Sequence, residues 1–345
     1  MVTEKDQFDR LFGHILGHQA TEIAAIGLRS GLFAAFAERP GLTAPELAAS
    51  ADLDGRYVSV WTRSAFAHGF LNRTAGDGFE LAPYIGALLL DPTSPSYLGG
   101  TFRMESATDE DYRRFPTLMA TGRIWPRSEH DPEMLQALAD ATTPDSVMML
   151  DHVLPLLPAV LGRLHDAGVM LEIGAGAGAH TLRYAMTFPK CRNVAMEMDR
   201  PSIDLARRRL DDAGVGERVE VRHHDANELD DHDRFDLATM NLVLHETGGE
   251  EEWRNVLLRT FDALRPGGAV VVSELPYPDD PDSYRNNPVY RRLAGIQLHE
   301  SVVGCGAITE GQLLDLVTAA GFVEVRVAIQ PRRSRHVVIG SKPDT

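Results

Sequence analysis

Residues 171–182 read LEIGAGAGAHTL, and they place Gly174, Gly176 and Gly178 directly after an apolar run. The spacing G-x-G-x-G is close to the dinucleotide-binding fingerprint G-x-G-x-x-G. In both patterns the missing Cβ atoms allow a strand-to-helix turn to approach a ligand closely. The stretch therefore predicts a ligand-binding turn between a strand and a helix, although its spacing alone does not identify the ligand.

The sequence around this turn alternates between strand and helix patterns from Val169 onward, which is typical of a doubly wound parallel sheet. The strand patterns lie at residues 169–174, 193–198, 218–225, 235–246, 269–276, 322–329 and 334–341, and the helical ones at 180–188, 201–214, 251–268 and 309–322. Only residues 330–333 separate the last two strands, which is too few for a helical crossover, so the last strand is expected to run antiparallel. We therefore predict an α/β fold with a Rossmann-like doubly wound sheet and an antiparallel last strand.

The N-terminal part of the chain has a different pattern. Apolar residues recur at helical spacing over residues 8–38, Thr43 and Glu46 form a capping box at the start of a second helix, and a third helix is expected over 54–70. Residues 71–83 then carry two short strand-like pieces around Ala-Gly-Asp-Gly, which is hairpin chemistry. Three helices and a hairpin predict an α-helical winged-helix module.

These patterns divide the chain into three parts. Residues 1–98 are expected to form the winged-helix domain, and its apolar first helix favours a homodimer interface. Residues 99–166 lack clean periodicity and are expected to be a helical connector that also covers a pocket. Residues 167–345 form the α/β domain.

Composition limits the partners of the chain. With 50 acidic and 34 basic residues the net charge is −16, which argues against nucleic acid because phosphate binding needs a basic surface. Cys191 and Cys305 are the two cysteines, so the sequence offers no disulfide framework. The polar N-terminus and the absence of a long apolar run indicate no membrane association, so a cytoplasmic enzyme is expected.

With this topology the chain resembles the class I S-adenosylmethionine-dependent methyltransferases over essentially its whole length. In that family the glycine turn passes under the methionine part of the cofactor, and an acid after the second strand holds both ribose hydroxyls. Glu197 stands in that position, and Asp199 is a weaker substitute. The resemblance implies S-adenosylmethionine as the cofactor, with these residues binding it: Glu172, Gly174, Gly176, Gly178, Glu197, Asp225, Ala226, Asn241 and Leu242.

The stretch NLVLHETGGEEEW at residues 241–253, together with the winged module, resembles the small-molecule O-methyltransferases of plants and bacteria. In that family a histidine after the fourth strand removes a proton from the acceptor hydroxyl, and His245 occupies its place. Glu274 matches one of the two glutamates that flank the base. The position of the second holds Ala307 or Ile308, so a plain base-and-orienter site looks incomplete.

A second histidine suggests a metal. His299, on a helix expected to lie over the pocket, would join His245 and Glu246 as two imidazoles and a carboxylate, a ligand set of iron and zinc sites. The chain is similar in outline to metal-dependent C-methyltransferases of the phenylpyruvate type. This resemblance implies a divalent zinc or iron ion and a 2-oxo acid acceptor methylated at its β-carbon, with Arg127 holding the acceptor carboxylate.

Three alternatives remain open. His245 could act as a metal-free general base that methylates a phenolic or enolic oxygen. The winged module could belong to a cofactor-sensing regulator, although residues 54–66 supply only two arginines for DNA. A dehydrogenase is disfavoured by the glycine spacing and by the antiparallel last strand.

Overall fold

The computed structural model describes residues 2–126, 129–278, 280–328 and 335–344. The chain divides into two compact units. The first comprises Met1–Asp109 and Asp140–Pro144, and the second comprises Glu110–Ala139 and Asp145–Thr345. The segment 99–166, which we expected to be a separate connector, is therefore divided between the two units. Residues 99–109 and 140–144 belong to the first unit, and the rest of the segment belongs to the second.

The second unit is built on a seven-stranded sheet in the order β5-β4-β3-β6-β7-β9-β8. The strands are β3 (Val169–Ile173), β4 (Arg192–Glu197), β5 (Val219–His223), β6 (Phe235–Asn241), β7 (Leu264–Glu274), β8 (Val323–Val327) and β9 (His336–Ser341). The first five strands pair in parallel, whereas β9 runs antiparallel between β7 and β8. The predicted doubly wound sheet with an antiparallel last strand is confirmed.

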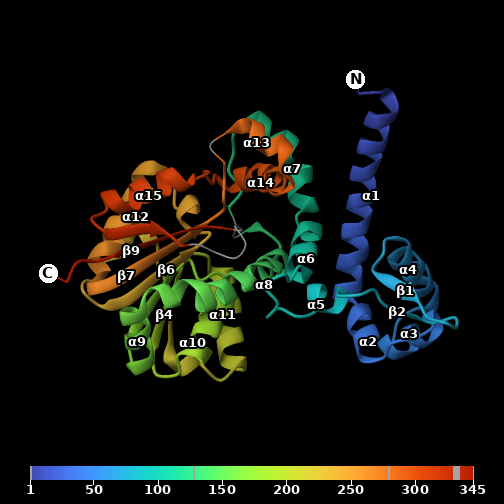
Figure 1. Ribbon diagram of the computed structural model, residues 1–345, viewed down its shortest axis with the longest axis horizontal. Helices are drawn as coiled ribbons and strands as arrows, with labels where there is room; N and C mark the ends of the chain where they lie inside the picture. The colour runs from blue at the N-terminus through green and yellow to red at the C-terminus, as the bar shows by residue number, and fades with distance from the viewer. Residues whose placement is uncertain (1, 127–128, 279, 329–334, 345) are drawn as a thin grey trace. The chain divides into compact units, whose positions relative to one another are not determined.

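Helices cover both faces of this sheet (Figure 1), as the near-continuous apolar strands require. They are α9 (Pro158–Asp166), α10 (Ala179–Thr187), α11 (Arg200–Asp212), α12 (Glu250–Ala263) and α15 (Glu310–Ala319). One buried cluster joins the sheet to α12 and α15 through Val256 and Val317, and another joins it to α9 and α10 through Leu164 and Tyr184. Because the strands β3 to β7 are parallel, their carboxyl ends meet at one edge, which we call the ligand edge.

Further helices of this chain are α7 (Asp109–Thr121), α8 (Pro132–Met148), α13 (Pro281–Asn286) and α14 (Pro288–Glu300). A π-helical turn, Met149–Val153, and a 3₁₀ turn, Leu154–Leu156, connect α8 to α9. Of these elements, α14 contributes directly to the site described below, because its last residues lie beside the end of β6.

The first unit contains α1 (Glu4–Arg29), α2 (Leu32–Glu38), α3 (Ala44–Ala51), α4 (Gly55–Ala67), β1 (Leu71–Arg73), β2 (Phe79–Leu81), α5 (Ile85–Leu89) and α6 (Gly99–Ala107). The capping box of Thr43 with Glu46 and the antiparallel β1–β2 hairpin are confirmed. The expected single helix over residues 8–38 is wrong in one respect. It breaks at Gly31, which adopts a left-handed backbone with φ of 67° that glycine takes without a steric cost.

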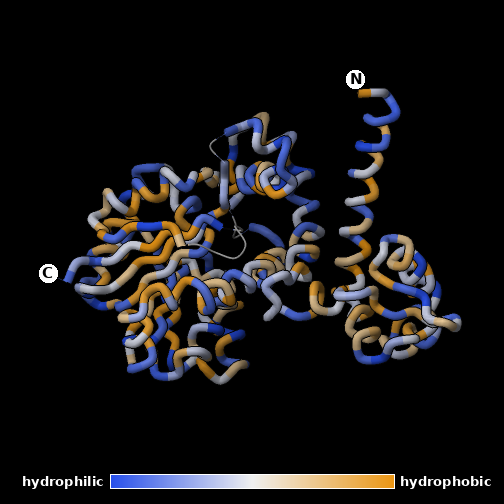
Figure 2. The backbone as a smooth tube through the Cα atoms, in the orientation of Figure 1, coloured by the Kyte–Doolittle hydropathy of each residue, from blue (hydrophilic) through white to orange (hydrophobic). Residues whose placement is uncertain are grey.

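The N-terminal half of α1 exposes apolar side chains at helical spacing. Figure 2 shows hydrophobic segments recurring along this helix, and the exposed members are Phe8, Leu11, Phe12, Ile15 and Leu16. Such a stripe is typical of a helix that packs against a partner. The winged-helix identity of this unit and its dimerisation remain predictions.

None of the described helices has, on its own, the length and apolar composition of a membrane span. Two bent helix pairs meet these criteria when each is taken together: Glu4–Arg29 with Leu32–Glu38, and Glu133–Leu156 with Pro158–Asp166.

Candidate active site

The glycine turn connects β3 to α10 at the ligand edge. Gly174, Gly176 and Gly178 have φ values of 69°, 52° and 75°, a backbone region that L side chains rarely adopt. A Cβ atom on Gly174 would lie 2.3 Å from Val243, and one on Gly178 would lie 2.9 Å from Ala206, whereas one on Gly176 would meet nothing within 4 Å. The outer glycines therefore allow close packing, and the middle one faces open space.

Glu197, the last residue of β4, is tied to this turn. Its Oε2 accepts a hydrogen bond from the Gly176 amide at 2.8 Å, and its Oε1 accepts from the amides of Met198 and Asp199, each at 2.8 Å. Burial raises the pKa of Glu197, although these three amides oppose the rise. Asp199 instead caps α11 by accepting from Ser202, so Glu197 is the acid that reaches the glycine turn.

Glu172 lies beneath the turn and is buried. Its carboxyl accepts a hydrogen bond from the Thr181 hydroxyl. Burial, with a smaller contribution from the charge of Glu197, raises the pKa of Glu172 to about 8. Burial therefore favours the neutral, protonated form of this side chain.

The remaining cofactor candidates follow β5 and β6 at the same edge. Asp225 Oδ1 accepts from the Asn227 amide at 2.8 Å and so starts the short 3₁₀ turn Ala226–Glu228. Asn241 donates through Nδ2 to Asp145 at 3.3 Å, while its buried Oδ1 has no hydrogen-bond partner among the described residues. Leu242 takes a left-handed backbone with φ of 58°. All the predicted cofactor residues are thus collected at the ends of neighbouring parallel strands.

His245 lies in the 3₁₀ turn Leu244–Glu246 after β6, and its side chain is 1% exposed. Its Nδ1 lies 2.6 Å from Oε2 of Glu274, the last residue of β7, and its backbone amide donates to Oε1 of the same carboxylate at 3.3 Å. The sequence pairing of His245 with Glu274 is therefore reproduced by the structure. This contact orients the imidazole and places a proton on Nδ1.

The other nitrogen of this imidazole faces two more carboxylates. His245 Nε2 lies 3.8 Å from Glu246 Oε1 and 3.7 Å from Glu300 Oε2, and it has no hydrogen-bond partner in the described part of the chain. Burial disfavours the charged imidazole, but Glu274 and Glu300 together outweigh it and raise the pKa of His245 well above its ordinary value.

Glu300 is a residue that the sequence analysis missed. We expected the second flanking carboxylate to be absent because Ala307 or Ile308 occupies its position, but Glu300 from the end of α14 provides one instead. The Tyr277 hydroxyl donates to Glu300 at 3.4 Å. The available signal was that Glu300 directly follows His299 in the candidate helix.

The expected role of His299 needs correction. Its Nε2 is 2.6 Å from Asp111 Oδ2, and His130 Nδ1 lies 3.2 Å from the same oxygen. Burial works against this carboxylate, yet the two imidazoles hold the pKa of Asp111 well below its usual range. His299 therefore pairs with an acid on α7, because the packing of α14 directs it there.

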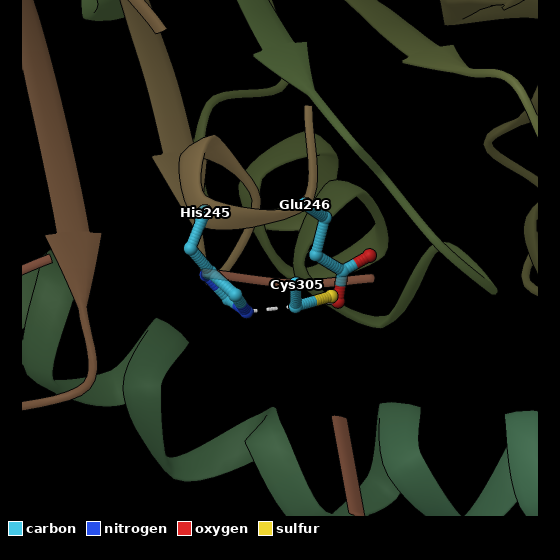
Figure 3. Close-up of side chains that lie close together, drawn as sticks. All are labelled: His245, Glu246 and Cys305. Atoms are coloured by element: carbon cyan, nitrogen blue, oxygen red, sulfur yellow. Dashed lines mark ion pairs between the residues drawn. The ribbon is translucent and has the colours of Figure 1, made fainter. Parts of the chain in front are cut away.

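The predicted metal set of His245, Glu246 and His299 is not assembled. Within the described residues, the three side chains whose ligand atoms all lie within 4.8 Å of one another are His245, Glu246 and Cys305, which Figure 3 shows together. Arg127, the predicted carboxylate-binding residue, lies outside the described residues.

Comparisons with known proteins agree with this geometry. Residues 171–270 match the family described as "Methyltransferase domain". A 3-hydroxy-5-methyl-1-naphthoate 3-O-methyltransferase from Streptomyces sahachiroi is 25% identical over 314 residues, covering 89% of this chain and 87% of the relative. An L-tyrosine C(3)-methyltransferase from Streptomyces lavendulae is 22% identical over 277 residues, covering 75% and 72%.

Solved structures share the whole fold. An O-methyltransferase family protein from Burkholderia thailandensis superposes with a TM-score of 0.70 at 20% identity, covering 99% of each chain. Human N-acetylserotonin methyltransferase in complex with S-adenosylmethionine gives a TM-score of 0.71 at 18% identity, covering 99% of this chain and 100% of that one. With the matched methyltransferase domain and the methyltransferase relatives, these findings identify the chain as an S-adenosylmethionine-dependent methyltransferase with the fold of the O-methyltransferases.

Proposed function

We propose that this enzyme transfers a methyl group to a hydroxyl oxygen on a small aromatic acceptor, with His245 as the general base. One observation carries the proposal. The Nδ1 of His245 is held by Glu274, while its buried Nε2 has no hydrogen-bond partner among the described residues. An oriented imidazole with an available nitrogen is what proton removal from a hydroxyl needs.

The acceptor hydroxyl would donate its proton to Nε2 as its oxygen forms a bond to the transferred methyl carbon. S-adenosylmethionine supplies that electrophilic methyl group, and S-adenosylhomocysteine leaves when the carbon–sulfur bond breaks. Glu274 stabilises the imidazolium that results, because its carboxylate stays on Nδ1 throughout. Holding both reactants in line would supply much of the rate enhancement.

The ligand edge fits the cofactor. The space beside Gly176 and the buried, unpartnered Oδ1 of Asn241 are suited to the methionine part, near Glu172, Gly174, Gly178 and Leu242. In this proposal Glu197 exchanges its amide contact for the ribose hydroxyls, since a carboxylate can accept two of them. Asp225 and Ala226 would lie at the adenine.

O-methylation is better supported than the C-methylation of a 2-oxo acid. One relative that aligns over most of the chain is named for O-methylation of a hydroxynaphthoate, and another is named for methylation at C(3) of tyrosine, so neither is named for a 2-oxo acid. The His299 ligand that the metal-dependent reaction was expected to need pairs with Asp111 instead.

The exposed apolar stripe on α1 also supports the homodimer that the sequence suggests, because a second copy would cover it. Sedimentation of the full chain, compared with a Phe12→Glu variant, tests this proposal. A monomeric wild-type protein would exclude it.

The reaction is tested with purified protein, ¹³C-methyl-labelled cofactor, and a hydroxynaphthoate or phenylpyruvate as acceptor. We expect a labelled methyl ether from the hydroxyarene after chelator treatment, identified by NMR. A methyl group on carbon, or an absolute need for added metal, would contradict the proposal. Calorimetry with S-adenosylhomocysteine confirms separately that the cofactor site is intact.

A further inference from the structure

Cys305 comes from a loop well separated in sequence from His245, and the fold fixes it beside that residue. The Gly306 amide donates to the His245 carbonyl oxygen at 3.1 Å, and the Cys305 amide donates to that of Glu300 at 3.4 Å. A Cβ atom on Gly306 would lie 2.8 Å from the Trp253 ring, so the loop is seated directly on α12. The thiol is therefore held near the imidazole by backbone contacts on both sides of it.

The atoms that converge here form a set of metal ligands. Nε2 of His245, a Glu246 carboxylate oxygen and Sγ of Cys305 all lie within 4.8 Å of one another (Figure 3). The separation of Nε2 from Glu246 Oε1 is 3.8 Å. Ligands of one tetrahedral zinc ion stand roughly 3.3–3.6 Å apart, as follows from metal–ligand bonds of about 2.0–2.3 Å, so small side-chain adjustments would complete the site.

The imidazole is prepared for this role by its surroundings. Its Nε2 is buried and has no hydrogen-bond partner among the described residues, while its Nδ1 is held by Glu274. A carboxylate on the far nitrogen of a ligating histidine fixes the tautomer and strengthens the ligand. The Glu246 side chain is 29% exposed, which gives an ion a path from solvent.

We propose that His245, Glu246 and Cys305 form a binding site for zinc that inhibits the enzyme reversibly. Nitrogen, oxygen and thiolate sulfur together favour zinc over magnesium or calcium, which prefer oxygen alone. The inhibitory effect rests on the proposed function, because the ion and the acceptor hydroxyl need the same Nε2. The site differs from the set suggested by the sequence, since Cys305 takes the place of His299.

Binding is tested on the chelator-treated full-length protein without any acceptor, using Co²⁺ as a spectroscopic probe and Zn²⁺ in competition with a chromophoric chelator. We expect one ion per chain and a near-ultraviolet thiolate-to-cobalt band. Cys305→Ser should lose the band and weaken zinc binding at least tenfold. Cys191→Ser is the matched control because Cys191 is the other cysteine and lies in a separate buried cluster. Cys191→Ser should therefore keep the cobalt band and the zinc affinity of the wild type.

Inhibition is then measured as methyl transfer against zinc concentration. Zinc should inhibit wild type and Cys191→Ser alike, excess acceptor should reverse the inhibition, and Cys305→Ser should need at least tenfold more zinc. Absence of the cobalt band, its persistence in Cys305→Ser, or activation by zinc would overturn the proposal. A band that depends on Cys305 in a protein without O-methyl transfer would leave the metal site intact and reject the proposed function.

Discussion

The cofactor side and the acceptor side of the ligand edge are built in different ways. On the cofactor side, the glycine turn and Glu197 lie within 27 residues, 171–197, and meet through backbone amides. On the acceptor side, His245, Glu274, Glu300 and Cys305 come from four separate segments and meet through side chains. Local chain geometry therefore sets the contact between the glycine turn and Glu197, whereas the arrangement of the converging side chains depends on the packing of every segment that carries one.

The largest predicted effect is a loss of catalytic rate from a substitution on the acceptor side. His245→Gln removes the proposed base and should lower kcat by about 10²–10⁴-fold, the usual contribution of general base catalysis. The affinity for S-adenosylhomocysteine, measured by calorimetry, should stay within about twofold, because the His245 side chain is held by Glu274 rather than by the glycine turn or Glu197. His232→Gln, an exposed histidine, is the control. If His245→Gln also lost affinity for S-adenosylhomocysteine, the cofactor side and the acceptor side would not act independently.

The reciprocal change is on the cofactor side. Glu197→Ala should weaken S-adenosylhomocysteine binding by about 1–3 kcal/mol, roughly 5–150-fold, because the ribose hydroxyls lose their acceptor. At saturating cofactor the rate of methyl transfer should recover most of its wild-type value. Glu217→Ala, on an exposed turn, should bind normally. Unchanged binding in Glu197→Ala would remove this residue from the cofactor site.

A smaller effect should appear in the pH profile. Since the pKa of His245 is raised, kcat/KM should increase with pH up to that raised pKa, above the range of an ordinary histidine. Glu300→Gln removes one cause, so the acidic limb should move to lower pH. The same linkage makes the imidazolium stabilise the fold below the ordinary histidine pKa, and this stability is lost as pH rises through the raised value. If the acidic limb of the kcat/KM profile lies at the same pH in Glu300→Gln as in the wild type, Glu300 does not raise the pKa of His245.

The smallest effect concerns stability on the cofactor side. The pKa of Glu172 is raised from 4.5 to about 8, so the folded protein holds this proton longer than the unfolded chain and loses stability as pH rises between those values. Glu172→Gln keeps an oxygen for Thr181 and avoids that loss. Its Tm should exceed that of the wild type by a few degrees more at pH 8 than at pH 5. If the Tm difference between Glu172→Gln and the wild type is the same at pH 5 and pH 8, the Glu172 carboxyl is more hydrated than its raised pKa implies.

The contrast explains what the sequence could predict. The glycine turn, Glu197 and the antiparallel last strand follow from local spacing, and the structure reproduces all three. His299 and Glu300 are adjacent in sequence, so only the rotation of α14 against its neighbours decides which of them faces His245. That rotation depends on contacts such as His299 with Asp111, 188 residues away, which no local pattern contains.

Cys305 illustrates the same limit. Its position depends on the bond between Gly306 and the His245 carbonyl and on the close approach of Gly306 to Trp253. Neither the short loop nor the histidine turn signals this pairing by itself. Residues that act through side chains from distant segments are therefore the ones that sequence reasoning is expected to miss.

The position of β9 has a consequence for how this chain matures during synthesis. In the described sheet β8 pairs with β9 alone, and β9 is also what joins β8 to β7. A growing polypeptide must therefore wait for residues 336–341 to leave the ribosome before this border of the sheet can close. Until then β7 and β8 expose unpaired backbone N–H and C=O groups at this border. Such exposed strand edges favour mispairing and binding by chaperones.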